Sequence, residues 1–556
     1  MGGELPRSRL SKPPGSSLFS RLRDANAWTS ARDQLLAFSL IFTCLFLTHG
    51  PLLRLPYFWD EAGYFIPAAR DLLLTGSLIP HSTLSNAHPP LVMLWLAFWW
   101  KYSAFTPAVT RTAMLLVAAF ALLGVWRLAR QVANEQVAMA TVVCTAVYPV
   151  FFAQSSLAHL DMMACAVTIW GLAMYVERRP LATVVFLALA PVAKETAIIT
   201  PMALLGWELF CPLLGRWNDQ TLCFRKRDWL RTLSLLLCAV PLLLWLSYHH
   251  YKTGYFLGNP EYLRYNLGAT LSPLRVALAM LLRLWHLLGY LNLFVLTLMT
   301  MYAMSQPALL ERDGSERQRI AVPVQLVFGV VIAAHVVALS ILGGAVLARY
   351  MLPVLPLLIL ICVSTLRRRL RYWVWCVVAV CAAFVFALFA PPPYRIAPED
   401  TLLYRDYVIL HKQAETEIAR RYPHARVLTA WPASDEMTRP FLAYVKQPMD
   451  VTRVKNFSQE EMERVARATG EFDVVFLFTT KWQPPHPLWQ KLPFGEAIQK
   501  RFFDYHEDIS PERAASMLGG RIVSYENRNN EWVAIIAIER VENANSSFEP
   551  QVSNFR

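Results

Sequence analysis

Long apolar segments alternate with short polar ones over the first 390 residues of the chain. About eleven of these segments approach or exceed the roughly 17–25 residues that an α-helix needs to cross the hydrocarbon core of a bilayer. They are residues 34–53, 110–130, 136–156, 161–177, 181–198, 199–215, 230–248, 276–303, 322–342, 350–366 and 373–390. The pattern therefore predicts a polytopic α-helical membrane protein, with a transmembrane domain over residues 34–390.

The polar stretch after the first apolar segment, residues 54–108, contains two shorter helical patterns. Apolar residues recur at helical spacing over 61–74, and Gly76 then supplies a helix C-cap. The aromatic-rich segment 89–102 has about 14 residues, which is short for a span, and its tryptophans suit the membrane interface. We expect both helices to lie at the membrane surface, within a single first outer loop.

Beyond residue 390 the composition changes to many charged residues interrupted by short β-like runs. The β-like runs are 425–430, 472–479 and 532–538, and helical patterns lie between them at 407–421 and 459–469. Strands that alternate with helices indicate an α/β fold, and roughly 165 residues are enough for an independent core. Residues 391–556 are therefore predicted to form a small α/β domain.

Composition and charge agree with a membrane protein and give it an orientation. Hydrophobic residues make up 55% of the chain and charged residues 17%, against about 25% charged in soluble domains. The net charge of +13 comes largely from loops between apolar segments, where the positive-inside rule expects basic residues, so it does not indicate nucleic-acid binding. The basic stretch 1–33 is expected to be a disordered cytosolic tail. The loop 54–108 and the domain 391–556 then lie outside.

Acidic residues stand at the outer ends of two apolar segments. Asp60 and Glu61 follow the first segment, and Asp161 opens another in "SSLAHLDMMACAV". Each could simply be a helix cap or a favourable first-turn charge. Acids from separate loops at one membrane face also suit a catalytic site, where a carboxylate accepts a proton from an attacking hydroxyl. The three are therefore candidate catalytic residues.

Positively charged and polar groups are predicted at the same membrane face. These candidate ligands for a lipid phosphate or sugar are His88, Lys194, Glu195, His249, His250, Arg264, Arg349 and Tyr350. Cations at headgroup level can bind a phosphate, and the positive-inside bias makes outward-facing Arg and Lys unexpected otherwise. Structural alternatives stay open, namely a buried Lys194–Glu195 pair, surface histidines and an Arg349 side chain that snorkels.

Carboxylates beside phosphate-binding cations suit the cleavage of a sugar–phosphate bond on a lipid carrier. A carboxylate would deprotonate an acceptor hydroxyl, the hydroxyl would attack the anomeric carbon, and the lipid phosphate would leave toward the cations. A single displacement of this kind inverts the anomeric centre. The expected partners are a polyprenyl-phosphate-linked sugar, a hydroxyl-bearing acceptor and membrane lipid.

Several of these stretches resemble the GT-C superfamily of polyprenyl-phosphate-sugar-dependent glycosyltransferases. The stretches are "FWDEAGYFIPAARDLLLTG", "HPPL", "HLDMMACAV", "AKETAIITP" and "RYMLP". They resemble most the bacterial branch of the protein O-mannosyltransferase and lipid A aminoarabinose transferase families, over roughly residues 35–360. The resemblance implies a GT-C fold in the bacterial inner membrane, and an acceptor that is a protein, lipid A or a glycan.

The same resemblance implies roles for individual residues. The first-loop base falls on Asp60, and a second acid falls on Asp161. A residue that contacts the carrier phosphate falls on His88, where the aminoarabinose branch has Lys and the protein mannosyltransferases have His. Some relatives bind a divalent metal near the first-loop acid, so a divalent metal cofactor at Asp60 and Glu61 is also considered.

A transporter or flippase of lipid-linked sugars is the alternative function. It would need charged groups at mid-span depth that form a path across the membrane. The predicted spans are largely apolar at their centres, with Arg283 and His286 as exceptions, which weighs against transport. A purely structural protein that presents the C-terminal domain would leave the acids unexplained.

Overall fold

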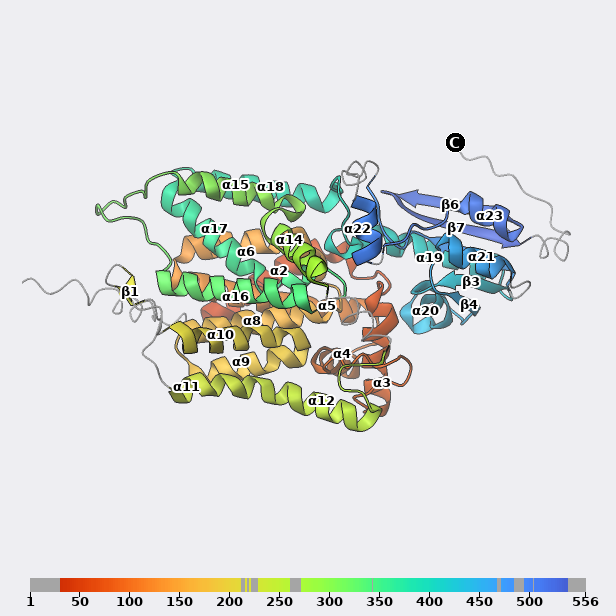
Figure 1. Ribbon diagram of the computed structural model, residues 1–556, viewed down its shortest axis with the longest axis horizontal. Helices are drawn as coiled ribbons and strands as arrows, with labels where there is room; N and C mark the ends of the chain where they lie inside the picture. Colours follow the sequence, from red (N-terminus) through yellow and green to blue (C-terminus); the bar gives the residue numbers. More distant parts are fainter. Residues whose placement is uncertain are drawn as a thin grey trace, which may run out of the picture.

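The computed structural model describes residues 31–211, 216–217, 220–221, 229–260, 272–342, 344–467, 472–484, 495–503 and 505–538. The predicted tail 1–33 lies almost wholly outside these residues. Figure 1 shows a bundle of helices lying side by side, with a C-terminal domain beyond one end of the bundle. The predicted combination of an α-helical membrane part with a small C-terminal sheet is confirmed.

The bundle is built from helices that follow the predicted apolar segments. They are α2 Ala31–Thr48, α5 Pro107–Val132, α6 Glu135–Val147, α7 Pro149–Gln154, α8 Leu160–Val176, α9 Pro180–Ala193, α10 Ile199–Phe210, α11 Trp229–Ser234, α12 Val240–Thr253, α14 Pro273–Leu288, α15 Leu293–Met304, α16 Val322–Ile341, α17 Leu355–Arg369 and α18 Trp373–Phe389. Within the described residues, five helical segments are long and apolar enough to cross a membrane, and four further apolar helices are shorter. The chain is an integral membrane protein, but the predicted count of about eleven spans is not confirmed.

Several predicted spans are interrupted, and two of the breaks lie well inside the span. The segment 276–303 divides into α14 and α15, because Leu291 and Asn292 between them have positive φ angles of 47° and 67°. The segment 136–156 divides into α6 and α7 at Pro149, whose missing backbone N–H cannot continue the hydrogen-bond ladder of a helix. Apolar composition by itself does not reveal such breaks.

The predicted surface helices of loop 54–108 are both present. The first consists of a π-helical turn, Glu61–Phe65, followed by α3, Ile66–Thr75. It ends at Gly76, which has the left-handed conformation expected of a C-cap glycine. The second helix, α4 Leu91–Tyr102, packs against α3 at the end of the bundle near the C-terminal domain (Figure 1).

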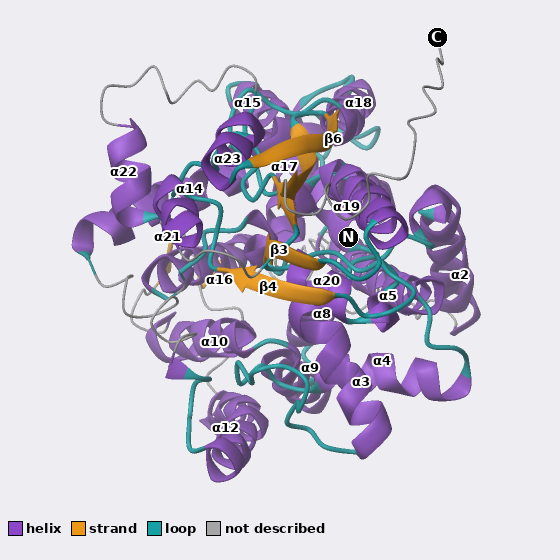
Figure 2. Ribbon diagram, turned by 90° about the vertical axis from the view of Figure 1, so that its right-hand side faces the viewer, coloured by secondary structure: helices purple, strands orange, loops and turns teal. Residues whose placement is uncertain are grey.

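The C-terminal domain is a five-stranded mixed sheet with helices around it. Its strands are β3 Arg426–Ala430, β4 Asp450–Val454, β5 Val474–Phe478, β6 Gly520–Arg528 and β7 Glu531–Ile538, in the order β4-β3-β5-β7-β6. Its helices are α19 Leu403–Arg421, α20 Ala433–Thr438, α21 Gln459–Arg467, α22 Gly495–Phe502 and α23 Pro511–Leu518. Strand β3 pairs in parallel with β4 and β5, whereas β7 pairs antiparallel with β5 and β6. Figure 2 looks onto this end of the molecule, with the sheet in front of the bundle.

Strands β3, β5 and β7 coincide with the three predicted β-like runs, whereas β4 and β6 were not predicted. Both missed strands are the edges of the sheet, and both are largely exposed or half-buried along their length. An edge strand faces solvent and carries more polar residues, so its apolar pattern is weak.

Aromatic residues join the C-terminal domain to the first outer loop. The ring of Trp59 contacts those of Tyr407 and Trp431, at centroid distances of 5.6 and 5.3 Å. Gly63 lies directly under Trp431, and a Cβ atom there would come within 2.5 Å of the indole ring. This close approach requires glycine at position 63. Through it, the C-terminal domain packs against the loop that carries Asp60.

Candidate active site

Charged residues from five separated segments meet where the bundle joins the C-terminal domain. Asp60 comes from the first loop, Asp161 from the start of α8, Lys194 from the end of α9, Arg349 from the loop before α17, and Glu399 from the segment after α18. We refer to these five residues as the arginine cluster. Four of them were predicted site residues, and the fold brings them together from distant parts of the sequence.

Arg349 is the centre of the cluster and is almost completely buried. Its Nη2 donates to Oδ2 of Asp60 at 2.5 Å, and its Nη1 lies 3.3 Å from Oε1 of Glu399. Its Nε lies 3.6 Å from Oδ2 of Asp161. Burial opposes the charge of Arg349, but the carboxylates of Asp60 and Glu399 outweigh it and raise the pKa of Arg349 well above its usual value. The guanidinium therefore stays charged, and the Arg349 side chain does not snorkel away from the protein.

The three carboxylates of the cluster differ in exposure. The side chain of Asp60 is 32% exposed, against 5% for Asp161 and 11% for Glu399. Asp60 occupies the N-cap position of the π-helical turn but makes no capping hydrogen bond, because its carboxylate is directed at Arg349 instead. Asp60 is thus the acid of this cluster that a substrate can reach.

A second layer of the cluster surrounds the ring of Tyr350. Lys194 donates to Oδ1 of Asp161 at 2.6 Å, and its Nζ lies 3.6 Å from the centroid of the Tyr350 ring. The guanidinium carbons of Arg283 and Arg349 lie 5.4 and 5.8 Å from the same centroid. Three cations therefore surround one aromatic ring, an arrangement in which the ring face offsets part of their charge.

Arg283 belongs to this group, although the sequence places it in the middle of an apolar segment. It is fully buried on α14 and donates to the backbone oxygens of Leu347, at 2.5 Å, and Ala345, at 3.4 Å. Within the described part of the chain, no carboxylate lies within ion-pair distance of Arg283, and its Nε has no hydrogen-bond partner. A buried cation of this kind is favourable only beside an anion, so Arg283 is a candidate phosphate ligand.

Glu61, the neighbour of Asp60, has a different environment. It is fully buried, and its two oxygens accept hydrogen bonds from Nη1 and Nη2 of Arg111 at 2.8 and 3.0 Å. The backbone N–H groups of Phe58 and Ala158 donate to the same oxygens at 2.8 and 2.6 Å. These bonds fill the four acceptor positions of a carboxylate. Glu61 therefore has no free position for a substrate proton or a metal ion, and the geometry favours a positioning role.

His88 and Glu195 form a pair of their own beside the cluster. Nδ1 of His88 lies 3.3 Å from Oε2 of Glu195, and the His88 ring meets Tyr64 edge-on. The ring of Phe65 contacts both His88 and His159, and the His159 ring lies beside Arg349. Lys194 and Glu195 are adjacent, but they do not pair with each other: Lys194 turns to Asp161, and Glu195 turns to His88.

Of the other three predicted ligands, the two that the structure describes do not reach the cluster. His249 is buried, with Nε2 2.8 Å from the hydroxyl of Ser85 and Nδ1 2.7 Å from the backbone oxygen of Tyr255. His250 is exposed and stacks on Phe256 at a centroid distance of 4.0 Å. Arg264 lies outside the described residues. The contacts of His249 and His250 favour structural roles.

Sequence analysis did not single out Glu399 or His159. Glu399 follows the last apolar segment in "IAPEDTLL", where nothing in the local pattern links it to the first loop. Burial raises the pKa of Glu399, although Arg349 acts in the opposite direction.

Nδ1 of His159 lies 3.0 Å from Nη1 of Arg349. Burial and then the charge of Arg349 hold the pKa of His159 well below its usual value, so its ring is neutral. In the sequence, only the position of His159 two residues before Asp161 indicated that it could belong to the site.

Part of the chain is similar to a known protein family. Residues 87–245 match the family model of dolichyl-phosphate-mannose-protein mannosyltransferase. No curated protein sequence is significantly similar to the chain.

The fold has solved counterparts. The crystal structure of ArnT from Cupriavidus metallidurans bound to undecaprenyl phosphate has a TM-score of 0.51 and 14% sequence identity, over 91% of this chain and 98% of that one. The apo state of the same protein has a TM-score of 0.51 and 14% identity, over 94% of this chain and 100% of that one. At this identity the similarity shows a shared fold. The chain therefore shares the fold of these structures, and its residues 87–245 are similar to the mannosyltransferase family.

Proposed function

We propose that the chain transfers a sugar from a polyprenyl-phosphate-linked donor to a hydroxyl acceptor, with Asp60 as the general base. The observation that carries this proposal is the position of Asp60, a one-third exposed carboxylate at the edge of a buried cluster that contains cations. The undecaprenyl phosphate bound to the ArnT structure supports a lipid phosphate as the carrier.

The reaction we propose is a single displacement. The carboxylate of Asp60 takes the proton of the acceptor hydroxyl as the hydroxyl oxygen forms a bond to the anomeric carbon of the sugar. The bond from that carbon to the phosphate oxygen breaks, and its electron pair leaves with the polyprenyl phosphate. Attack from the side opposite the leaving group inverts the anomeric centre.

Lys194 and Arg349 would stabilise the charge that develops on the leaving phosphate, and Arg283 would bind the phosphate of the donor. Lys194 and Arg349 are held by Asp161, which we interpret as a positioning residue for them. Arg283 brings a positive charge that no described carboxylate neutralises. Fixed cations in a site that excludes water act on a developing anion more strongly than they would in solvent.

The proposal also includes the membrane face at which the reaction takes place and the class of acceptor. We propose the outer face of a bacterial inner membrane, with a cytosolic N-terminus and the C-terminal domain outside. The acceptor would be a hydroxyl of an exported protein, of lipid A or of a glycan. The contacts of Trp59 with Tyr407 and Trp431 place the C-terminal domain beside Asp60, where an acceptor would enter.

The test is release of polyprenyl phosphate from a polyprenyl-phosphate hexose, by the purified full-length chain in lipid nanodiscs with a membrane extract as the acceptor source. Loss of a general base lowers a rate by about 10²–10⁴-fold, so Asp60→Asn should reduce release by at least about 100-fold. Glu417→Gln removes a half-buried carboxylate on α19 that pairs with Arg421, and it serves as the matched control, with release unchanged.

Equal rates for the wild type and Asp60→Asn would exclude Asp60 as the base. Labelled lipid-linked sugar that crosses the bilayer of proteoliposomes without release of polyprenyl phosphate would contradict the transferase and support the flippase alternative.

A further inference from the structure

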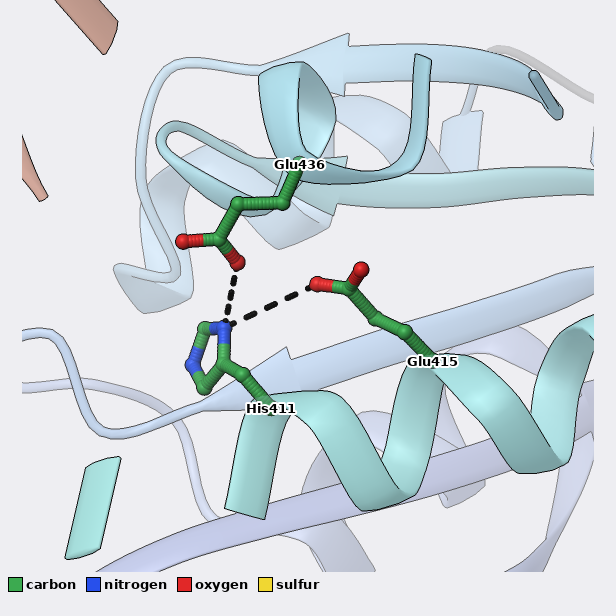
Figure 3. A group of neighbouring side chains, drawn as sticks. All are labelled: His411, Glu415 and Glu436. Atoms are coloured by element: carbon green, nitrogen blue, oxygen red, sulfur yellow. Dashed lines mark hydrogen bonds and ion pairs between the residues drawn. The ribbon is translucent and has the colours of Figure 1, made fainter. Parts of the chain in front are cut away.

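Three buried side chains in the C-terminal domain form a cluster that the proposed reaction does not use. His411 and Glu415 are four residues apart on α19 and therefore point to the same side of that helix, and Glu436 faces them from α20 (Figure 3). All three are fully buried. Within the described residues, this is the only group of three or more His, Cys, Asp or Glu side chains close enough to share a metal ion.

The potential ligand atoms converge on one point. Nδ1 of His411 lies 2.7 Å from Oε2 of Glu436 and 3.8 Å from Oε1 of Glu415, as the dashed lines in Figure 3 show. Bonds of about 2.0–2.1 Å to a tetrahedral zinc ion place neighbouring ligand atoms roughly 3.3 Å apart. The two distances lie on either side of this value, so small side-chain rotations would bring the three atoms around one ion.

Several other polar atoms of the cluster lack hydrogen-bond partners in the described part of the chain. Neither oxygen of Glu415 has one among the described residues, and Oε1 of Glu436 and Nε2 of His411 have none either. Lys412, the next residue on α19, turns away and donates to the backbone oxygens of Ala443 and Tyr444. Two buried carboxylates without a cation are strongly unfavourable, whereas one divalent ion would neutralise both.

We propose that His411, Glu415 and Glu436 bind a divalent transition-metal cation of the zinc class. One imidazole nitrogen and two carboxylate oxygens are suitable zinc ligands. A proton shared by Glu415 and Glu436 would neutralise only one negative charge, whereas a divalent ion would neutralise both. All three ligands are fully buried, so an ion held by them would lie away from a substrate at the surface.

The cation would link α19 and α20, and residues on or next to both helices contact the loop that carries Asp60. One turn before His411, Tyr407 stacks on the His411 ring at 3.9 Å and meets Phe58 at 5.2 Å. On the other side, Trp431 stands just before α20 and packs against Trp59. A metal ion that joins α19 to α20 would therefore fix the rings on which the segment from Phe58 to Asp60 rests.

The first test is metal analysis of the full-length chain, purified in lipid nanodiscs from zinc-supplemented cells. We expect about one zinc ion per chain in the wild type. The content should fall at least tenfold in Glu415→Gln and in Glu436→Gln, and should stay unchanged in Glu417→Gln, which alters a half-buried acid outside the cluster on the same helix. A wild type without stoichiometric metal, or a Glu415→Gln/Glu436→Gln variant that retains it, would overturn the proposal.

A second measurement does not depend on how well the variants fold. X-ray absorption at the zinc edge of the wild-type protein should show only nitrogen and oxygen neighbours at about 2.0–2.1 Å, including one imidazole. A shell that contains sulfur would assign the ion to cysteines elsewhere and contradict the site. Neither measurement involves glycosyl transfer, so failure of the metal site and failure of the proposed reaction remain distinguishable.

Discussion

The arginine cluster contains Asp60, and the neighbouring residue Glu61 forms a pair with Arg111. The two adjacent acids have very different environments. In the cluster, Arg349 is shared by several carboxylates, and one of them, Asp60, is a third exposed. In the pair, Glu61 and Arg111 are fully buried, and every acceptor position of Glu61 is filled. The cluster has a carboxylate that can meet a substrate, whereas the pair has none.

The difference shows how the protein can hold an accessible acid on a short loop. The guanidinium of Arg111 bonds to Glu61 and to the backbone oxygens of Pro56 and Ser156, so it ties the first loop to the segment before α8. This rigid pair fixes the backbone one residue away from Asp60. A catalytic side chain benefits from such support, because small misplacements reduce the rate of reaction strongly.

The largest effect on stability is expected from breaking the pair. Arg111→Met leaves Glu61 buried without its cation, which typically costs about 3–5 kcal/mol. Asp60→Asn should cost less than about 1 kcal/mol, because the Asp60 side chain is partly exposed and Arg349 keeps two other carboxylates. The free energy of unfolding in denaturant measures both.

A double variant tests whether the unpaired Glu61 carboxylate causes the loss of stability in Arg111→Met. Arg111→Met combined with Glu61→Gln removes the stranded charge, so it should lose less stability than Arg111→Met alone. An equal or larger loss would show that packing around Arg111, rather than the unpaired carboxylate, sets the cost.

A smaller effect is expected at Arg283, the buried arginine that contrasts with Arg111. Charge-assisted hydrogen bonds contribute about 1.5–3 kcal/mol, so Arg283→Gln should raise the KM for the lipid donor by roughly 10-fold or more and change kcat less. Steady-state kinetics with a polyprenyl-phosphate hexose separates the two constants. Lys101→Gln, at an exposed position at the end of α4, is the control. A fall in kcat with constant KM would argue against a role for Arg283 in donor binding.

A separate prediction concerns pH and a buried acid without a bonded cation. Burial, and then the charge of Glu399, raise the pKa of Asp400 from 3.8 to about 8. Between these values the native state holds a proton that the unfolded chain has released, so stability falls as pH rises from about 4 to 8 and is then constant. The slope is at most about 1.4 kcal/mol per pH unit.

Thermal unfolding of the wild type and Asp400→Asn over this pH range measures the difference. The wild type should lose stability more steeply as pH rises, because asparagine does not titrate. Parallel pH profiles for the two proteins would show that Asp400 is ionised in the native state at low pH.

Much of the architecture could be predicted because it depends on local composition. The apolar segments, Gly76 as a C-cap and the central strands β3, β5 and β7 each follow from residues close together in the chain. The edge strands β4 and β6 and the break between α14 and α15 were missed. Edge strands carry a weak apolar pattern, and the break depends on backbone angles rather than on hydropathy.

The sequence by itself determined which segments are apolar, which end of the chain forms a separate sheet, and which charged residues are available for chemistry. It could not distinguish Asp60 from Glu61, because their partners Arg349 and Arg111 stand 289 and 50 residues away in the chain. Only the tertiary structure decided that one acid stays accessible and the other is enclosed. The physical reason is that burial and ion pairing depend on which distant segments pack together, and no local pattern encodes that.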